Sequence, residues 1–280
     1  MIKFLSGLCA IILLLLGPPV SAGMPEGATL RPGVAYGPDP AQRMDVYLPP
    51  RPIHAPILLM VHGGGWRRGD KDNPGVVDNK IARWLPKGVI FVSVDYRMMP
   101  AAKPLTQAED VARALAKVQE LAPGWGGDPA NIILMGHSAG AHLVALLNAA
   151  PEIAAAQGAK PWKGAVLLDS GAMDVPAIMN ARHLPLYDKA FGDDPAEWQA
   201  ASPFHRLAGP TRPLLAICRK RGNQSCPANQ AFALKARKLG GSVDVLPMDL
   251  SHGEINAQLG LPGAYTERVE EFMRGLGWKL

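Results

Sequence analysis

The sequence lacks long hydrophobic runs, charge runs and internal repeats. Its N-terminal apolar block, residues 8–16, falls short of the roughly 20 apolar residues that a membrane-spanning helix needs. No long polar linker divides the chain, so nothing indicates a second domain. The net charge of +5 over 280 residues is mild and dispersed, which argues against a nucleic-acid partner.

The N-terminus has the pattern of a secretory leader. One lysine precedes the apolar block, and small residues at positions 20 and 22 suit cleavage after Ala22. Cys9 follows a leucine where a lipoprotein signal requires a small residue, so we expect no lipid anchor. We expect a signal peptide at residues 1–22, a single domain at 23–280, and a secreted or periplasmic location.

Cysteine is scarce, with three residues in the whole chain. Beyond the leader, Cys218 and Cys226 stand eight positions apart in a turn-rich segment. In an oxidising compartment this spacing favours a disulfide over two free thiols. Neither cysteine has metal-ligand spacing, and the sequence indicates no metal or cofactor. The basic cluster Arg219, Lys220 and Arg221 favours a solvated loop over an anion site.

Fully apolar runs alternate with amphipathic segments along the chain. Such runs are typical of strands buried on both faces of a parallel sheet, and the spacing of Val111, Leu115 and Val118 predicts a helix packed on it. We expect an antiparallel hairpin at residues 33–36 and 42–48, and buried strands at 57–61, 89–95, 132–136, 164–169, 213–217 and 243–246. Helices are expected at 81–85, 107–121, 141–149, 228–239 and 265–276. The pattern predicts an α/β fold with a mostly parallel central sheet and helices on both faces.

Residues 176–204 lack a single period but carry large side chains such as Tyr187, Phe191 and Trp198. Inserted between core strands, this segment predicts short helices. They either form a small lid that shapes an acyl or aryl pocket, or merely cover the edge of the sheet.

A serine stands between two glycines where the strand at 132–136 gives way to a helix. Only hydrogen at Gly136 and Gly140 lets strand and helix pass closely, and so tight a turn strains the backbone of Ser138. The hydroxyl is then exposed above the sheet edge, and the N–H of Ala139 points to the same space. The turn predicts a nucleophile and half of an oxyanion hole.

Two further segments point to the same edge of the sheet. Residues 62–66 have the sequence His-Gly-Gly-Gly-Trp after a buried strand, and the glycines permit backbone N–H groups to face a ligand, which indicates an oxyanion loop. His252 stands on a predicted loop after the last predicted strand, where a base must lie to meet a serine exposed at that edge. Of the seven histidines, it is the predicted base.

In combination these features resemble an α/β hydrolase, specifically the hormone-sensitive-lipase-like and acetyl-esterase branch that includes feruloyl and xylan esterases and kynurenine formamidases. The motifs that carry the resemblance are His62-Gly63-Gly64-Gly65-Trp66, Val94-Asp95-Tyr96-Arg97, Gly127-Asp128-Pro129, Gly136-His137-Ser138-Ala139-Gly140-Ala141-His142 and Ser251-His252-Gly253. The resemblance implies that Ser138 is the nucleophile and His252 the base. It also implies that Gly64, Gly65 and Ala139 supply the oxyanion N–H groups.

The acid of the expected triad departs from the family pattern. The family places an Asp or Glu after the strand predicted at 213–217, but residues 218–227 contain no carboxylate. Asn223 stands near the expected place, so either an amide orients the histidine or a carboxylate comes from elsewhere. Asp169, at the end of the preceding strand, is the first alternative and Asp174 the second.

The leading hypothesis is a secreted carboxylic-ester hydrolase that acts on small or aromatic acyl esters through an acyl-enzyme. Its expected partner is a small-molecule ester. An amidase of the aryl-formamidase kind is the second hypothesis, and a non-catalytic binding module on a hydrolase scaffold is the third. The sequence leaves the oligomeric state and the preferred acyl group open.

Overall fold

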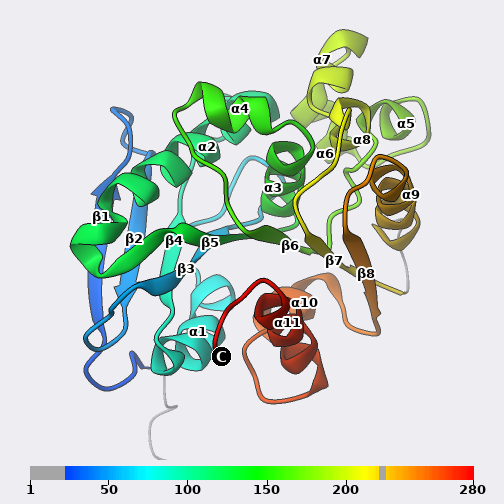
Figure 1. Cartoon of the computed structure of the whole chain (residues 1–280). Helices are drawn as coiled ribbons and strands as arrows, with labels where there is room; N and C mark the ends of the chain where they lie inside the picture. The colour runs from blue at the N-terminus through cyan, green and yellow to red at the C-terminus, as the bar shows by residue number, and fades with distance from the viewer. Residues whose placement is uncertain (1–22, 221–224) are drawn as a thin grey trace, which may run out of the picture.

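Eight strands form one sheet in the computed structural model, which describes residues 23–220 and 225–280. The predicted leader at 1–22, together with Arg221 and Asn223, lies outside the described residues. The strands are β1 (Thr29–Ala35), β2 (Arg43–Leu48), β3 (Ala55–Val61), β4 (Ile90–Val94), β5 (Gly127–His137), β6 (Gly164–Leu168), β7 (Leu214–Arg219) and β8 (Val243–Met248). Their order across the sheet is β1-β2-β4-β3-β5-β6-β7-β8 (Figure 1).

The sheet is mostly parallel. β2 pairs antiparallel with β1 and with β4, and the pairings from β4 through β3 and β5 to β8 are parallel. The predicted hairpin and the predicted mostly parallel sheet are therefore confirmed. Because the carboxyl ends of parallel strands lie at one edge, the turns after β3, β5, β6 and β8 meet there.

Helices connect the strands and cover both faces of the sheet. They are α1 (Pro74–Trp84), α2 (Pro104–Leu121), α3 (Ala139–Ala149), α4 (Pro151–Ala156), α5 (Val175–Met179), α6 (Pro185–Phe191), α7 (Pro195–Ala200), α8 (Pro203–Arg206), α9 (Ser225–Lys238), α10 (His252–Ala257) and α11 (Ala264–Gly275), with 3-10 turns at Leu85–Lys87 and Ala122–Trp125. α2, α3, α4 and α9 lie on one face, and α1, α10 and α11 on the other (Figure 1).

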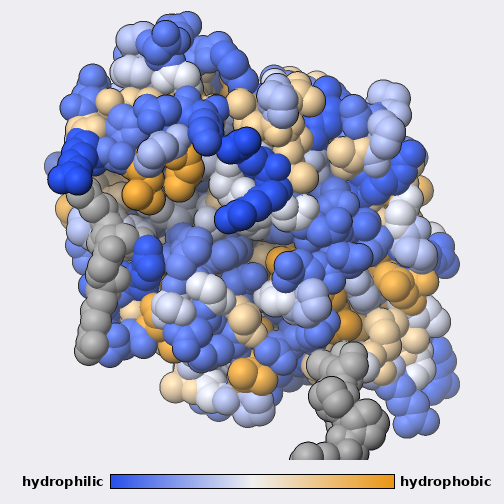
Figure 2. Space-filling view, turned by 180° about the vertical axis from the view of Figure 1, so that it is seen from behind, coloured by the Kyte–Doolittle hydropathy of each residue, from blue (hydrophilic) through white to orange (hydrophobic). Residues whose placement is uncertain are grey.

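The alternation of side chains along β3 explains why its sequence is almost wholly apolar. Ile57 and Leu59 pack into the core beneath α2 and α3, whereas Leu58 and Met60 pack into the core beneath α1 and α10. All four are fully buried, because successive side chains of a strand point to opposite faces. On the outer face drawn in Figure 2, hydrophobic residues occur in separate small groups among hydrophilic ones.

Some boundaries differ from those expected. β5 begins at Gly127, well before residue 132, because Ala55 of β3 pairs with Gly127 across an irregularity in register. α1 begins at Pro74, where the side chain of Asn73 caps it, and the buried Val76 and Val77 belong to it as well as the predicted residues from Ile81 onward. His252 is the first residue of α10, not a loop residue.

Between β6 and β7 the chain forms the short helices that the sequence predicted, α5 to α8. Two rings of α6 contact Trp66 in the loop after β3: that of Tyr187 with centroids 5.9 Å apart and that of Phe191 at 5.1 Å. The segment therefore packs on the loop after β3, and α8 also packs on α3. In the described ranges, no helix has the length and apolar character needed to cross a bilayer.

One buried carboxylate joins α11 to α1 beneath the sheet. Glu270, whose side chain is 2% exposed, accepts hydrogen bonds from Arg83 at 2.8 and 2.9 Å and from Lys87 at 2.8 and 3.0 Å. The Trp84 indole also donates to it, at 3.1 Å. Burial works to raise the pKa of Glu270, but the hydrogen bonds from Arg83 and Lys87 outweigh it and lower the pKa to about 2. The charged form is therefore strongly favoured in the folded state.

We expect Glu270→Gln to lower the free energy of unfolding by about 3 kcal/mol at pH 7, because it leaves two cations without their buried partner. Because folding lowers the pKa of Glu270, its carboxylate stabilises the folded state at pH values above the pKa it has in the unfolded chain. The difference in unfolding free energy between wild type and variant should therefore shrink as the pH falls from about 4.5 towards 2. Urea denaturation over this range measures it. Glu271→Gln is the matched control, because Glu271 is 60% exposed and faces Arg268 only at 3.6 Å; an equal loss in the control would contradict the assignment.

Candidate active site

Ser138 lies on a sharp turn between β5 and α3. Its backbone has φ of 53°, in the left-handed region that side chains rarely adopt. A Cβ at Gly136 would lie 2.4 Å from the carbonyl oxygen of Gly140, and a Cβ at Gly140 would lie 2.3 Å from that of Val61. The two glycines are thus required by close backbone approach, and the serine between them is only partly buried.

The structure brings Ser138, His252 and Asp169 together in one hydrogen-bonded row. His252 Nε2 lies 2.9 Å from Ser138 Oγ, and His252 Nδ1 lies 2.7 Å from Asp169 Oδ2. An ionised carboxylate only accepts, so Nδ1–H donates to Asp169 and Nε2 is left to accept from the serine hydroxyl. This is the arrangement of a nucleophile, a general base and an orienting acid.

Asp169 directly follows β6, and its side chain is fully buried. Its Oδ1 accepts from the Ser225 hydroxyl at 2.7 Å and from the Arg219 backbone N–H at 3.0 Å. Burial works to raise the pKa of Asp169, but hydrogen bonds from His252, Ser225 and the Arg219 amide outweigh it and hold the pKa below its usual value. Asp169 is therefore a carboxylate facing His252 at neutral pH.

Asp174, the second candidate for the acid, lies away from His252. Asp174 caps α5, accepting from the Ala177 N–H at 3.0 Å, and pairs with His205 at 3.5 Å. Asn223 is outside the described residues. Of the carboxylates weighed from the sequence, Asp169 is the one that contacts His252.

The glycine loop after β3 runs beside the serine turn. A Cβ at Gly63 would lie 3.0 Å from Ser138 Cβ, and one at Gly64, where φ is +126°, would lie 1.7 Å from the Arg68 carbonyl oxygen. The backbone amides of Gly64, Gly65 and Ala139 donate to no acceptor within residues 23–220 and 225–280. They are therefore available to a substrate oxygen at this edge of the sheet.

Comparisons with known proteins find a matching family model and similar sequences. A family model described as BD-FAE matches residues 44–163. The probable isoprenylcysteine alpha-carbonyl methylesterase ICME of Oryza sativa subsp. japonica is 35% identical over 113 residues, which are 40% of this chain and 27% of that protein. Esterase LipC of Mycobacterium tuberculosis is 35% identical over 134 residues, 46% of this chain and 32% of LipC. The chain thus spans about a third or less of the length of these relatives.

The fold also matches a solved structure along most of its length. Esterase B of Lactobacillus Rhamnosis superposes with a TM-score of 0.73 at 20% identity, covering 91% of this chain and 87% of that one. The chain has the α/β-hydrolase fold, and part of its sequence is similar to esterases. The resemblance that the motifs indicated, and the predicted fold class, are confirmed.

Two further histidines, His142 and His137, hold parts of the site in place, although the sequence alone did not identify them as site residues. Burial lowers the pKa of His142 to about 4, so its ring is neutral at pH 7. Its Nδ1 accepts from the Trp66 indole at 3.2 Å and its Nε2–H donates to the Ala201 carbonyl at 2.7 Å. His142 therefore joins the glycine loop, α3 and the segment before α8.

His137 fixes the backbone of the predicted base. Burial, and then the neighbouring His252, lower the pKa of His137 to about 3. The neutral ring donates Nε2–H to the His252 carbonyl at 3.0 Å, and the two rings lie 4.6 Å apart. Both supporting histidines flank the serine in the Gly-His-Ser-Ala-Gly-Ala-His motif, which is the signal that could have identified them.

We expect Gly140→Ala to destabilise the hydrolase by about 3 kcal/mol or to prevent folding, because the added methyl group overlaps the Val61 and His62 carbonyls at 2.3 and 2.5 Å. The yield of folded protein and its urea midpoint measure this. Gly124→Ala is the control, since nothing lies within 4 Å of the Cβ it would add. A Gly140→Ala protein as stable as Gly124→Ala would contradict the steric account of the turn.

Proposed function

We propose that this α/β hydrolase is a secreted serine carboxylic-ester hydrolase that acts on small or aromatic acyl esters through an acyl-enzyme. The observation that carries the proposal is the row Ser138 Oγ, His252 Nε2 and Nδ1, and Asp169 Oδ2, with contacts of 2.9 and 2.7 Å. The names of the relatives, a methylesterase and an esterase, support the same reaction class.

The chemistry follows from the hydrogen-bond directions. His252 Nε2 takes the proton of Ser138 Oγ as the oxygen attacks the ester carbonyl, and the carboxylate of Asp169 stabilises the imidazolium that forms. His252 then gives this proton to the leaving alcohol. Water repeats the sequence on the acyl-enzyme and releases the acid.

The oxyanion of each tetrahedral intermediate lies between the glycine loop and the start of α3. The amides of Gly64, Gly65 and Ala139 are the proposed donors. They come from backbone that is already fixed, because Trp66 is tied to His142 and the carbonyl of Trp66 accepts from Gln107 at 2.8 Å. Donors held in advance stabilise developing charge without reorganisation.

The acyl preference rests on the aromatic residues packed on the glycine loop, which runs beside the serine turn. Trp66, Tyr187 and Phe191 pack against one another with centroid distances from 5.1 to 6.2 Å. Rigid, flat rings next to the acyl group would favour a small or aromatic acyl group over a long chain.

The secreted location rests on the leader pattern and on the disulfide. Cys218 and Cys226 are joined in the structure, in agreement with the sequence prediction, and disulfides persist in oxidising compartments. The proposal also treats residues 23–280 as one domain. N-terminal sequencing of protein recovered from the periplasm or medium tests the cleavage after Ala22.

Hydrolysis of a panel of acetyl, butyryl, octanoyl and feruloyl esters by the mature protein tests the reaction. We expect acetyl, butyryl or feruloyl esters to exceed the octanoyl ester in kcat/KM. Faster turnover of an N-formyl-aryl-amide than of every ester would favour the formamidase alternative. Failure of Ser138 to react with a fluorophosphonate probe, together with no turnover, would favour a binding module.

A further inference from the structure

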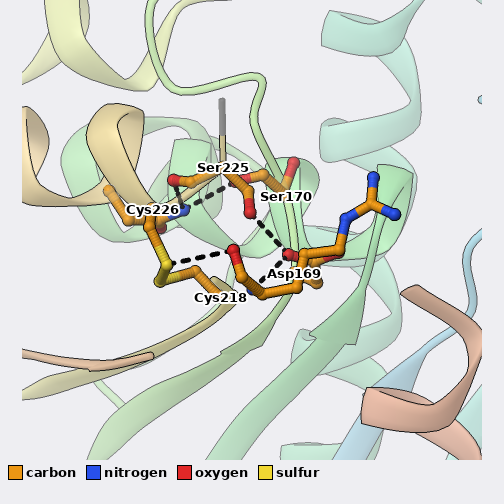
Figure 3. Close-up of a disulfide and its surroundings, with 7 residues drawn as sticks. Asp169, Ser170, Cys218, Ser225 and Cys226 are labelled. Carbon is orange, nitrogen blue, oxygen red and sulfur yellow. Dashed lines mark hydrogen bonds and ion pairs between the residues drawn. A yellow bond between two sulfur atoms is a disulfide. The ribbon is translucent and has the colours of Figure 1, made fainter. Parts of the chain in front are cut away.

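A disulfide that the chemistry above does not use lies next to the carboxylate of Asp169. It joins Cys218, in β7, to Cys226, in the first turn of α9. Each cysteine is the sequence neighbour of a donor to Asp169 Oδ1: Arg219 through its backbone N–H at 3.0 Å, and Ser225 through its hydroxyl at 2.7 Å. Figure 3 shows Ser225, the disulfide and Asp169 gathered in one place.

We propose that the Cys218–Cys226 disulfide positions the triad acid: it holds the Arg219 amide and the Ser225 hydroxyl on Oδ1 of Asp169, so that Oδ2 faces His252. The inference rests on the proposed function, since it assigns these residues a part in the same reaction. Ser225 and the disulfide are positioning residues, because neither touches the serine or the histidine.

The two oxygens of Asp169 have separate tasks in this geometry. Oδ1 accepts from both donors next to the bridge, whereas Oδ2 accepts from Nδ1–H of His252 at 2.7 Å and faces Nε of Arg219 at 3.4 Å. The carboxylate has no exposed surface, so water cannot readily replace a donor that moves away. A carboxylate that loses its donors on Oδ1 is held on the Oδ2 side alone, so its hydrogen bond to His252 is less firmly directed.

The bridge constrains both donors through their backbones. The Cα atoms of Cys218 and Cys226 are 5.1 Å apart, and Cys226 Sγ lies 3.3 Å from the Arg219 carbonyl oxygen. Asn229, buried in α9, donates to the carbonyls of Ser170 and Ser225, each at 2.7 Å. The start of α9 is therefore tied to the end of β7 by the disulfide and to the segment after β6 by Asn229.

The location of the bridge also matches the departure of the acid from the family pattern. The segment after β7, where the family has its carboxylate, carries the disulfide and supplies donors to a carboxylate that follows β6. In this chain the ends of that segment do not supply the acid but donate hydrogen bonds to it.

The test compares Cys218→Ser/Cys226→Ser and Ser225→Ala with the wild type on the best ester of the panel, well below the melting temperature. Each should lower kcat by roughly 10- to 100-fold, as expected for losing hydrogen bonds to a charge. KM should stay within about twofold, because the acid acts on the imidazolium formed during reaction. Ser93→Ala is the control, since Ser93 is buried in β4 and its hydroxyl has no partner among the described residues.

A double-mutant cycle separates positioning from general support of the fold. In an Asp169→Ala background, replacing the two cysteines should lower the residual kcat by less than about twofold, because the carboxylate that they act through is gone. The same loss of kcat with and without Asp169 would overturn the inference. So would wild-type kcat in both Cys218→Ser/Cys226→Ser and Ser225→Ala.

Reduction gives a second route that needs no substitution. Dithiothreitol is oxidised to its cyclic disulfide while the protein disulfide gains two electrons and two protons and becomes two thiols. Activity should fall as thiols appear and return on reoxidation, whereas Cys218→Ser/Cys226→Ser should not respond. A wild type that is fully reduced and fully active would contradict the inference alone, whereas absence of Ser138-dependent hydrolysis in the untreated protein would contradict the proposed function.

Discussion

Replacing Ser138 with alanine is expected to lower kcat for ester hydrolysis by roughly 10⁴- to 10⁶-fold. The hydroxyl is the group that His252 Nε2 contacts at 2.9 Å, so its loss removes the proposed nucleophile and leaves only the proposed oxyanion donors to act on a bound ester. The remaining rate should come from water attack, and the variant should form no acyl-enzyme.

The fold of this variant should be unchanged, because the turn is held by backbone contacts. The N–H of Ser138 donates to the Leu168 carbonyl at 2.9 Å and its carbonyl accepts from His142 at 3.1 Å. Circular dichroism and thermal melting check this, and fluorophosphonate labelling should disappear along with turnover. Activity within tenfold of the wild type would assign the nucleophile to another residue.

Local chemistry made the serine turn predictable from the sequence. The requirement for Gly136 and Gly140 depends on backbone atoms a few residues away and on Val61, and any sequence with this close crossing needs hydrogen at both places. The buried strands were predictable for a similar reason: successive side chains such as Leu58 and Leu59 pack into the cores on opposite faces of the sheet, so both must be apolar. Such patterns can be recognised in a sequence without knowledge of the tertiary fold.

The supports of the site were less predictable because they depend on distant partners. His142 meets Ala201 across 59 positions, and Glu270 meets Arg83 across 187. Helical spacing puts Glu270 on the same face of α11 as Val269 and Met273, but it does not identify Arg83 and Lys87 as its partners. The choice between Asp169 and Asp174 was difficult for the same reason. Both residues follow β6, and only contact with His252, which is far away in the sequence, distinguishes them.

Replacing Asp169 with asparagine is expected to lower kcat by roughly 10³- to 10⁴-fold, whereas Asp174→Asn should leave it within about twofold. The first carboxylate accepts from His252 Nδ1 at 2.7 Å. The second caps α5 and faces His205, and asparagine caps helices about as well as aspartate. Each of the two variants removes one negative charge, and the two positions are five residues apart. Comparing them therefore distinguishes a role at the site from a general effect of charge.

The size of the expected loss follows from the direction of one hydrogen bond. An amide at position 169 can turn its NH₂ group toward His252, in which case Nδ1 must accept and the ring proton moves to Nε2. Nε2 is then a donor to Ser138 and cannot take its proton, which is why a change of one atom has so large an effect. Pre-steady-state measurement of the acylation rate on both variants tests this. Equal losses in the two variants, or a loss confined to Asn223→Ala, would show that Asp169 does not orient the base.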